Sequence, residues 1–94
     1  MDDRYAHLRI PDHVVYREMD GALVLTSLKA GGFLRLDDIG ERIWRALERG
    51  AGRDAVVVEL TKAYDVSSDD CRRDVTAFLD DLAARQFVDL GAPR

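Results

Sequence analysis

Residue types that build most catalytic and metal centres are scarce in this sequence. Its 94 residues include one cysteine and two histidines. The single cysteine, Cys71, cannot form an intrachain disulfide. With no secretory leader and no long apolar run at the N-terminus, we expect a cytoplasmic protein. No apolar run approaches the roughly 18 residues that a membrane-spanning helix needs, so the sequence predicts no such helix.

The positions of these few residues argue against a reactive site. His7 and His13 have no neighbouring cysteine and no HExxH spacing, so solvated or structural roles fit them better than metal binding. Cys71 falls on the apolar stripe of a predicted helix, where a small buried side chain is the usual role. The pair Gly31-Gly32 lacks the GxGxxG or GxxxxGK context of a phosphate-binding loop. We therefore predict no catalytic residues, no metal and no cofactor, and hence no enzyme.

The charge composition restricts the partners. Lys and Arg number 14 against 18 Asp and Glu, which gives a formal net charge of -4 and a pI near 5.0. Tight non-specific binding to nucleic acid depends on basic residues that neutralise phosphates, so polyanions are poor partners for this chain. Apolar residues make up 47% and charged residues 34% of the sequence. That balance is typical of an ordinary globular domain.

The first half of the sequence predicts a three-stranded antiparallel sheet. Residues 13–19 and 22–28 are rich in β-branched and aromatic residues and flank Asp20-Gly21, a strong signal for a two-residue hairpin turn. After a turn at residues 29–32, residues 33–36 form a short third strand. We expect this strand to lie at the edge of the sheet.

Three helical patterns follow the sheet. Asp37 and Asp38 are N-cap candidates for the first, and Glu41 lies three residues after Asp38, as in a capping box. Trp44 on this helix is expected to anchor the core. The predicted helices span residues 38–48 and 54–64, and the third begins after Ser67 or Ser68.

Together these elements predict one α+β domain over residues 13–90, with winged helix-turn-helix-like topology and its strands first. Residues 1–12 are polar and irregular, and Pro11 disfavours helix at the residue before it. We expect this segment to be a frayed N-terminal lead-in. Residues 86–90 are expected to form a short extended tail.

The topology raises the alternative of a winged-helix transcriptional regulator. Such a regulator lays a recognition helix in the major groove of DNA, yet the third predicted helix carries more acidic than basic residues. Its charged side chains are Asp69, Asp70, Asp74, Asp80 and Asp81 against Arg72, Arg73 and Arg85. Acidic charge of this kind predicts that the protein is not retained on heparin at moderate salt.

The edge of the third strand offers a different binding mode. A strand edge leaves backbone donors and acceptors unpaired, and another polypeptide can add a strand there. We expect the third helix to form the opposite wall of a groove. The predicted peptide-binding residues are Phe33, Leu34, Arg35 and Leu36 on the strand and Arg73, Asp74, Ala77, Phe78 and Asp81 on the helix. The alternative is a solvated edge, protected by Arg35 and by its shortness.

The arrangement G-x-F-L-x-L-D-x-x-G-x-x-I-W-x-x-L at residues 31–47 resembles the PqqD-like family. The Tyr-Asp-Val turn at 64–66 and the pattern D-V-x-x-F-L-x-x-L at 74–82 carry the same resemblance, which covers residues 10–90. Members are small winged-helix-like domains that recognise the leader of ribosomally synthesised, post-translationally modified peptides (RiPPs). The resemblance implies that a leader peptide adds to the third strand and packs against the third helix.

Within this family, the segment TSLKAGGFLRLDD looks more similar to the stand-alone leader-binding proteins of lasso peptide clusters than to the pyrroloquinoline quinone protein. The resemblance implies a peptide chaperone that presents a precursor peptide to a separate leader peptidase or other modifying enzyme. It also implies a protein without chemistry of its own. The acidic charge and the lack of a long apolar run separately predict that neither nucleic acid nor a membrane is a partner. A chaperone for pyrroloquinoline quinone biosynthesis, or for another radical-enzyme pathway, is the alternative.

Overall fold

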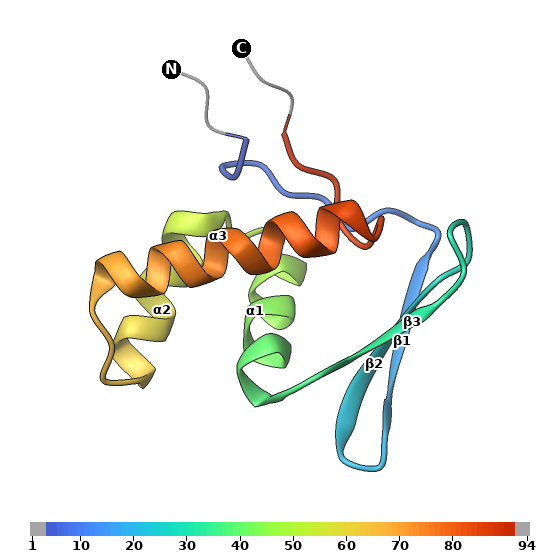
Figure 1. Ribbon diagram of the computed structural model, residues 1–94, viewed down its shortest axis with the longest axis horizontal. Helices are drawn as coiled ribbons and strands as arrows, with labels where there is room; N and C mark the ends of the chain where they lie inside the picture. The colour runs from blue at the N-terminus through green and yellow to red at the C-terminus, as the bar shows by residue number, and fades with distance from the viewer. Residues whose placement is uncertain (1–3, 92–94) are drawn as a thin grey trace.

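A computed structural model describes residues 4–91, in which three antiparallel strands are followed by three helices (Figure 1). The strands are β1 (Val14–Met19), β2 (Ala22–Ser27) and β3 (Phe33–Leu36), and their order in the sheet follows the chain. The helices are α1 (Asp38–Glu48), α2 (Arg53–Ala63) and α3 (Ser68–Ala84). The predicted α+β architecture is confirmed, and β3 lies at an edge of the sheet as expected.

Turn residues with left-handed backbone conformations connect the strands. Asp20 and Gly21 have φ values of 52° and 80°, as the tight turns of two-residue hairpins require. They set Met19 opposite Ala22 and so fix the register of β1 and β2. The expected hairpin therefore forms at the predicted residues.

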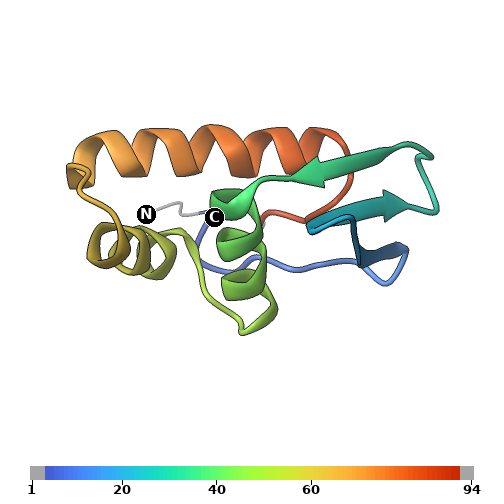
Figure 2. The same ribbon diagram turned by 90° about the horizontal axis from the view of Figure 1, so that it is seen from below.

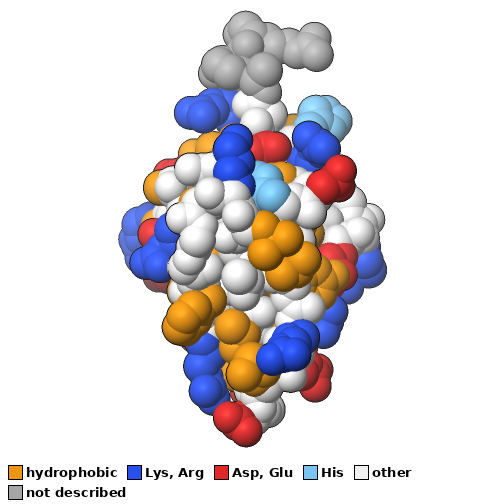
Figure 3. Space-filling view, turned by 90° about the vertical axis from the view of Figure 1, so that its right-hand side faces the viewer, with side chains coloured by type: hydrophobic (Ala, Val, Ile, Leu, Met, Phe, Trp, Pro, Cys, Tyr) orange, Lys and Arg blue, Asp and Glu red, His pale blue; other side chains and the backbone are white. Residues whose placement is uncertain are grey.

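The sheet has one face on the core and one toward solvent, because side chains alternate along each strand. Tyr16, Leu25 and Leu34 lie side by side across the three strands on the core face. The next row, Val15, Thr26 and Phe33, lies on the other face, where Phe33 is 75% exposed. Figure 3 looks onto this end of the molecule and shows hydrophobic side chains there beside basic ones.

Trp44 of α1 joins the helices to the sheet. Its side chain is fully buried, and its ring meets that of Tyr16 edge to face, with centroids 5.6 Å apart at 79°. The Tyr16 hydroxyl donates a hydrogen bond to Glu48 near the end of α1. This bond and desolvation raise the pKa of Tyr16. The expected role of Trp44 as core anchor is confirmed.

Two side-chain caps define where helices begin. The Asp37 Oδ1 accepts a 2.7 Å hydrogen bond from the backbone N–H of Gly40 and caps α1. Because Asp37 is the cap, Glu41 is not at the capping-box position, and the expected pairing of Asp38 with Glu41 is wrong. Ser67 caps α3 by accepting from the N–H of Asp70.

The N-terminal segment is anchored, so the expectation of a frayed lead-in is wrong for residues 4–10. Arg9 and Asp89 form an antiparallel bridge, which places this segment beside the C-terminal one above α3 (Figure 1). The Arg53 N–H donates to the carbonyl of Tyr5, at 2.8 Å. Next to it, a Cβ on Gly52 would lie 2.7 Å from the carbonyl oxygen of Ala6, so only glycine lets the segment approach α2 this closely.

Replacement of Trp44 by alanine should destabilise the domain. A buried aromatic truncated to alanine costs about 3–5 kcal/mol, and a domain of this size then melts roughly 12 °C or more lower, or does not fold. Thermal melting followed by circular dichroism measures the change. Val58→Ala is the matched control, because Val58 is 52% exposed on α2. Equal melting temperatures for the two variants would contradict the anchoring role of Trp44.

The two aspartates at the start of α1 should differ in their effect on stability. Asp37→Ala removes the N-cap hydrogen bond and should lower the free energy of unfolding by about 1 kcal/mol. Asp38→Ala removes only a charge near the helix N-terminus and should lower the free energy of unfolding by roughly a few tenths of a kcal/mol. Urea denaturation of both variants measures the difference. A larger loss of stability for Asp38→Ala than for Asp37→Ala would contradict the assignment of Asp37 as the N-cap.

Candidate functional site

The free edge of β3 presents backbone groups from two residues. The Ser27 N–H donates to the Gly32 carbonyl, at 3.4 Å, which makes this a hydrogen-bonded pair. Hydrogen-bonded and non-hydrogen-bonded pairs alternate in an antiparallel ladder. Leu34 and Leu36 therefore direct their backbone groups toward β2, opposite Leu25 and Leu23.

By the same alternation, Phe33 and Arg35 direct their N–H and C=O groups away from β2. The β1–β2 ladder agrees with this assignment: the Leu28 N–H donates to the His13 carbonyl, at 2.8 Å, so Val24 and Thr26 use their own backbone groups toward β1. No described strand lies beyond β3 within residues 4–91. The two outward residues are therefore available to pair with an added strand.

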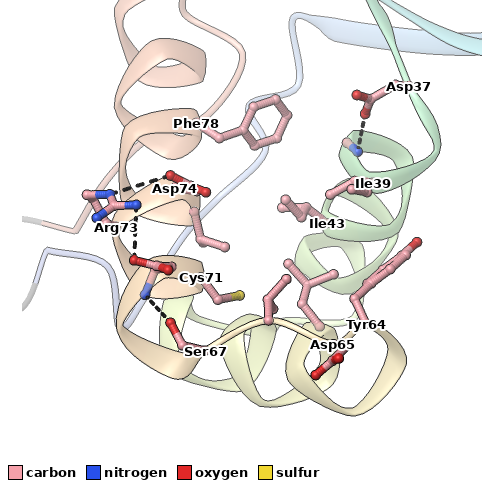
Figure 4. Close-up of a pocket in the computed structure, with 15 residues that line it drawn as sticks. Asp37, Ile39, Ile43, Tyr64, Asp65, Ser67, Cys71, Arg73, Asp74 and Phe78 are labelled. Carbon is pink, nitrogen blue, oxygen red and sulfur yellow. Dashed lines mark hydrogen bonds and ion pairs between the residues drawn. The ribbon is translucent and has the colours of Figure 1, made fainter.

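Helix α3 lies on the side of this free edge. Figure 2 shows β3 between β2 and α3, with the chain running from β3 into α1 beneath the helix. Where β3 ends, a hollow of about 630 Å³ opens between α1 and α3 (Figure 4). It is lined by Asp37, Ile39, Gly40, Ile43, Leu60, Tyr64, Asp65, Val66, Ser67, Asp70, Cys71, Arg73, Asp74, Val75 and Phe78.

The hollow has an apolar interior that remains partly open to solvent. Ile43 and Val75 are almost fully buried at its floor, whereas Ile39 is 45% and Val66 47% exposed. Phe78 is half-buried and points across from α3 toward α1 (Figure 4). Exposed apolar side chains around a concavity of this size are typical of a site that buries a ligand side chain.

Only some of the predicted site residues meet in this hollow. Arg73, Asp74 and Phe78 line it. Ala77 and Asp81 are exposed on α3 but lie outside its lining, and Asp81 pairs with Arg85 at 3.2 Å.

The strand residues divide between faces as well. Leu36 is 4% exposed and Leu34 half-buried on the core face, whereas Phe33 and Arg35 are exposed on the opposite face. The backbone groups of Leu34 and Leu36 are directed to β2. Of the four strand residues in the predicted site, only Phe33 and Arg35 therefore direct backbone groups to the free edge.

Most residues that line the hollow were not predicted as site residues, among them Ile39, Tyr64 and Val66. Ile39 lies in the first turn of α1, where its side chain remains 45% exposed. Tyr64 and Val66 belong to the turn between α2 and α3. The signal that could have found Val66 is an apolar β-branched residue in a polar turn, where no core contact explains it.

Helix α3 carries several of the charged side chains that line the hollow. Arg73 pairs with Asp70 at 3.2 Å and with Asp74 at 3.7 Å. Burial raises the pKa of the Cys71 thiol, and the nearby Asp74 carboxylate raises it further. Within residues 4–91, no group of His, Cys, Asp and Glu side chains could hold a metal ion. The hollow thus offers apolar contact and negative charge, and the raised pKa of Cys71 favours its thiol form.

The family of this chain follows from comparison with known proteins. Residues 22–88 match the family described as coenzyme PQQ synthesis protein D (PqqD). This chain belongs to the PqqD family. A comparison with curated proteins finds no match. No helix in the described part of this PqqD-family chain has the length and apolar character needed to cross a membrane.

Two solved structures are similar to this PqqD-family protein over most of its length. One is TbiB1 in complex with the TbiA(beta) leader peptide, at 34% identity and a TM-score of 0.80, covering 85% of this chain and 93% of that one. The other is a lasso peptide synthetase B1 complexed with the leader peptide, at 25% identity and a TM-score of 0.81, covering 88% and 98%. Both similar structures thus contain a leader peptide.

The single cysteine should report on the hollow. Cys71 is 6% exposed and its pKa is raised, so at pH 8 the folded protein should react with Ellman's reagent at least about tenfold more slowly than the urea-unfolded chain. Asp74→Asn should speed the reaction, because removal of the neighbouring negative charge lowers the thiol pKa. Equal rates for the folded and unfolded protein would show that Cys71 is exposed.

Proposed function

We propose that this protein binds the leader segment of a ribosomally synthesised precursor peptide by strand addition at β3 and presents it to a separate maturation enzyme. A leader peptidase of a lasso peptide pathway is the proposed enzyme. The observation that carries the proposal is the pair of outward backbone positions, Phe33 and Arg35, directly beside the apolar hollow between α1 and α3. Membership of the PqqD family and two similar structures with leader peptides support it.

The two parts of the site would contribute differently to binding. Backbone pairing along β3 supplies affinity without reading the leader's side chains, whereas the hollow selects the side chain that enters it. A leader that is disordered when free loses conformational entropy as it pairs, so its affinity depends on how well the hollow buries that side chain. Both parts must therefore be occupied for tight and selective binding.

The protein would act by tethering. A leader held on β3 keeps the core peptide near the enzyme that binds this protein, so the encounter of core and active site becomes effectively intramolecular. An enzyme with weak affinity for the free core can then still process it. Tethering of this kind requires no chemistry by the protein that binds the leader.

The description of the family supports a second candidate pathway, the biosynthesis of pyrroloquinoline quinone. A PqqD-type chaperone for pyrroloquinoline quinone biosynthesis would use the same groove for a different precursor. The genes beside this one distinguish the two. A short precursor frame next to genes for a transglutaminase-like peptidase and an asparagine-synthetase-like cyclase indicates the lasso pathway, whereas genes for quinone synthesis indicate the second.

Arg35→Pro tests strand addition at β3. Proline lacks the N–H that Arg35 directs to the free edge, and the β2–β3 ladder does not use that group, so the sheet should persist. We expect binding of a fluorescein-labelled leader to weaken at least about tenfold. The leader comes from the precursor frame beside the gene, with the TbiA(beta) leader as a second probe. Fluorescence polarisation measures the dissociation constant.

Arg35→Ala is the matched control for this variant. It removes the side chain but keeps the N–H, and its dissociation constant should stay within about threefold of the parent value. Circular dichroism of both variants checks that the fold is intact. If both bind normally while Lys62→Glu on α2 abolishes binding, the peptide occupies another surface and the proposed groove is wrong.

A further inference from the structure

We infer that the hollow between α1 and α3 selects leaders in which an apolar anchor residue is flanked by lysine or arginine. This inference rests on the proposed function and names the peptide chemistry that the same site reads. It follows from the charges at the mouth of the hollow, from its apolar floor, and from its position at the end of β3.

Acidic side chains surround the mouth of the hollow. Its lining contains four aspartates, Asp37, Asp65, Asp70 and Asp74, against the single basic residue Arg73. They come from three places in the chain: the β3–α1 junction, the α2–α3 turn and α3. The four carboxylates therefore do not belong to one helix face alone, and one of them, that of Asp37, also caps α1.

The basic residues nearby are already engaged. Arg73 is paired with Asp70 and Asp74, and in Figure 4 it points away from the hollow. Arg42 lies over the ring of Tyr64, 5.6 Å from its centroid. Among residues 4–91, no basic side chain forms an ion pair with Asp65. The charge at the mouth is thus only partly neutralised, and a cationic ligand group complements it.

The floor of the hollow favours an apolar side chain of the bound peptide. Ile43, Val75 and the half-buried Phe78 offer no hydrogen-bonding groups from their side chains, so a charged group cannot enter the floor without losing its hydration. A peptide with lysine or arginine on either side of an apolar anchor meets both requirements, because the charged groups reach the aspartates at the mouth while the anchor fills the floor. Acidic neighbours would be repelled.

The position of the hollow sets the spacing of these features in the leader. β3 ends at Leu36, and the next residue, Asp37, already lines the hollow. A segment paired with Phe33 and Arg35 therefore continues into the hollow after about two to four residues, given the rise of a strand. The leader should contain a strand-forming segment and, a few residues away, the apolar anchor with its basic neighbours.

Selection from a random peptide library tests the inference without a known ligand. The immobilised protein is used to enrich an mRNA-displayed library of random peptides about 16 residues long, enough to span the strand and the hollow. We expect enriched peptides to share an apolar residue whose neighbours favour Lys and Arg over Asp and Glu by at least roughly threefold. The Asp65→Asn/Asp74→Asn double variant should enrich the same apolar residue without that bias.

Single variants give the sign of the effect on one enriched basic peptide. Asp65→Asn and Asp74→Asn should each weaken binding by roughly two- to fivefold, whereas Arg73→Gln should strengthen it, because the carboxylates that Arg73 neutralised become available. Added salt should raise the dissociation constant of the parent protein more than that of the double variant. Bound peptide should also slow the modification of Cys71, which lines the hollow.

The outcomes separate this inference from the proposed function. Enriched peptides that bind the parent protein but not Arg35→Pro need the β3 edge. If such peptides show no excess of Lys and Arg beside the anchor, that result overturns the inference and leaves the proposed function standing. Equal binding to the parent and to both aspartate variants would do the same. Enriched peptides that bind Arg35→Pro as tightly as the parent protein would overturn the proposed strand addition and, with it, the inference.

Discussion

The contact between Trp44 and Tyr16 is the interaction on which the rest of this structure depends. A three-stranded sheet with one solvated face has little core of its own, and this edge-to-face pair of rings attaches it to the helices. The Tyr16–Glu48 hydrogen bond and the Arg45–Glu18 ion pair link β1 to α1 beside this contact, and Arg45 also pairs with Glu48 within α1. Because α1 follows β3 directly, the same contact fixes where β3 ends.

Attachment through α1 leaves the edge of β3 uncovered. The helices bury their apolar residues against the core face of the sheet and against one another, and α2 packs mainly on α3. No described helix covers the backbone groups of Phe33 and Arg35. An unpaired edge exposes a protein to uncontrolled strand pairing, and here the edge is only four residues long and carries Arg35. A short edge beside a selective hollow limits pairing to peptides that fit both.

The N-terminal segment shows how distant parts of the chain stabilise the wall of this groove. The Tyr5 hydroxyl donates to Asp80 on α3 at 2.6 Å, and the Arg53 guanidinium of α2 lies over the Tyr5 ring, 4.5 Å from its centroid. Gly52 allows the backbone of this segment to approach the start of α2. These contacts hold α2 and α3 together on the side away from the hollow, so the wall does not depend on a ligand for its position.

The sequence by itself determined the elements and their order, because each rests on local physics: the left-handed turn at Asp20-Gly21, the alternation in β3 and the helical pattern that buries Trp44. It also predicted Arg73, Asp74 and Phe78 beside the groove. Only the tertiary structure decided that Ile39 and Val66 line the hollow while Ala77 and Asp81 do not, and that residues 4–10 are anchored. Those features depend on where separate elements meet, and spacing along one helix or turn does not encode the distance to its neighbour.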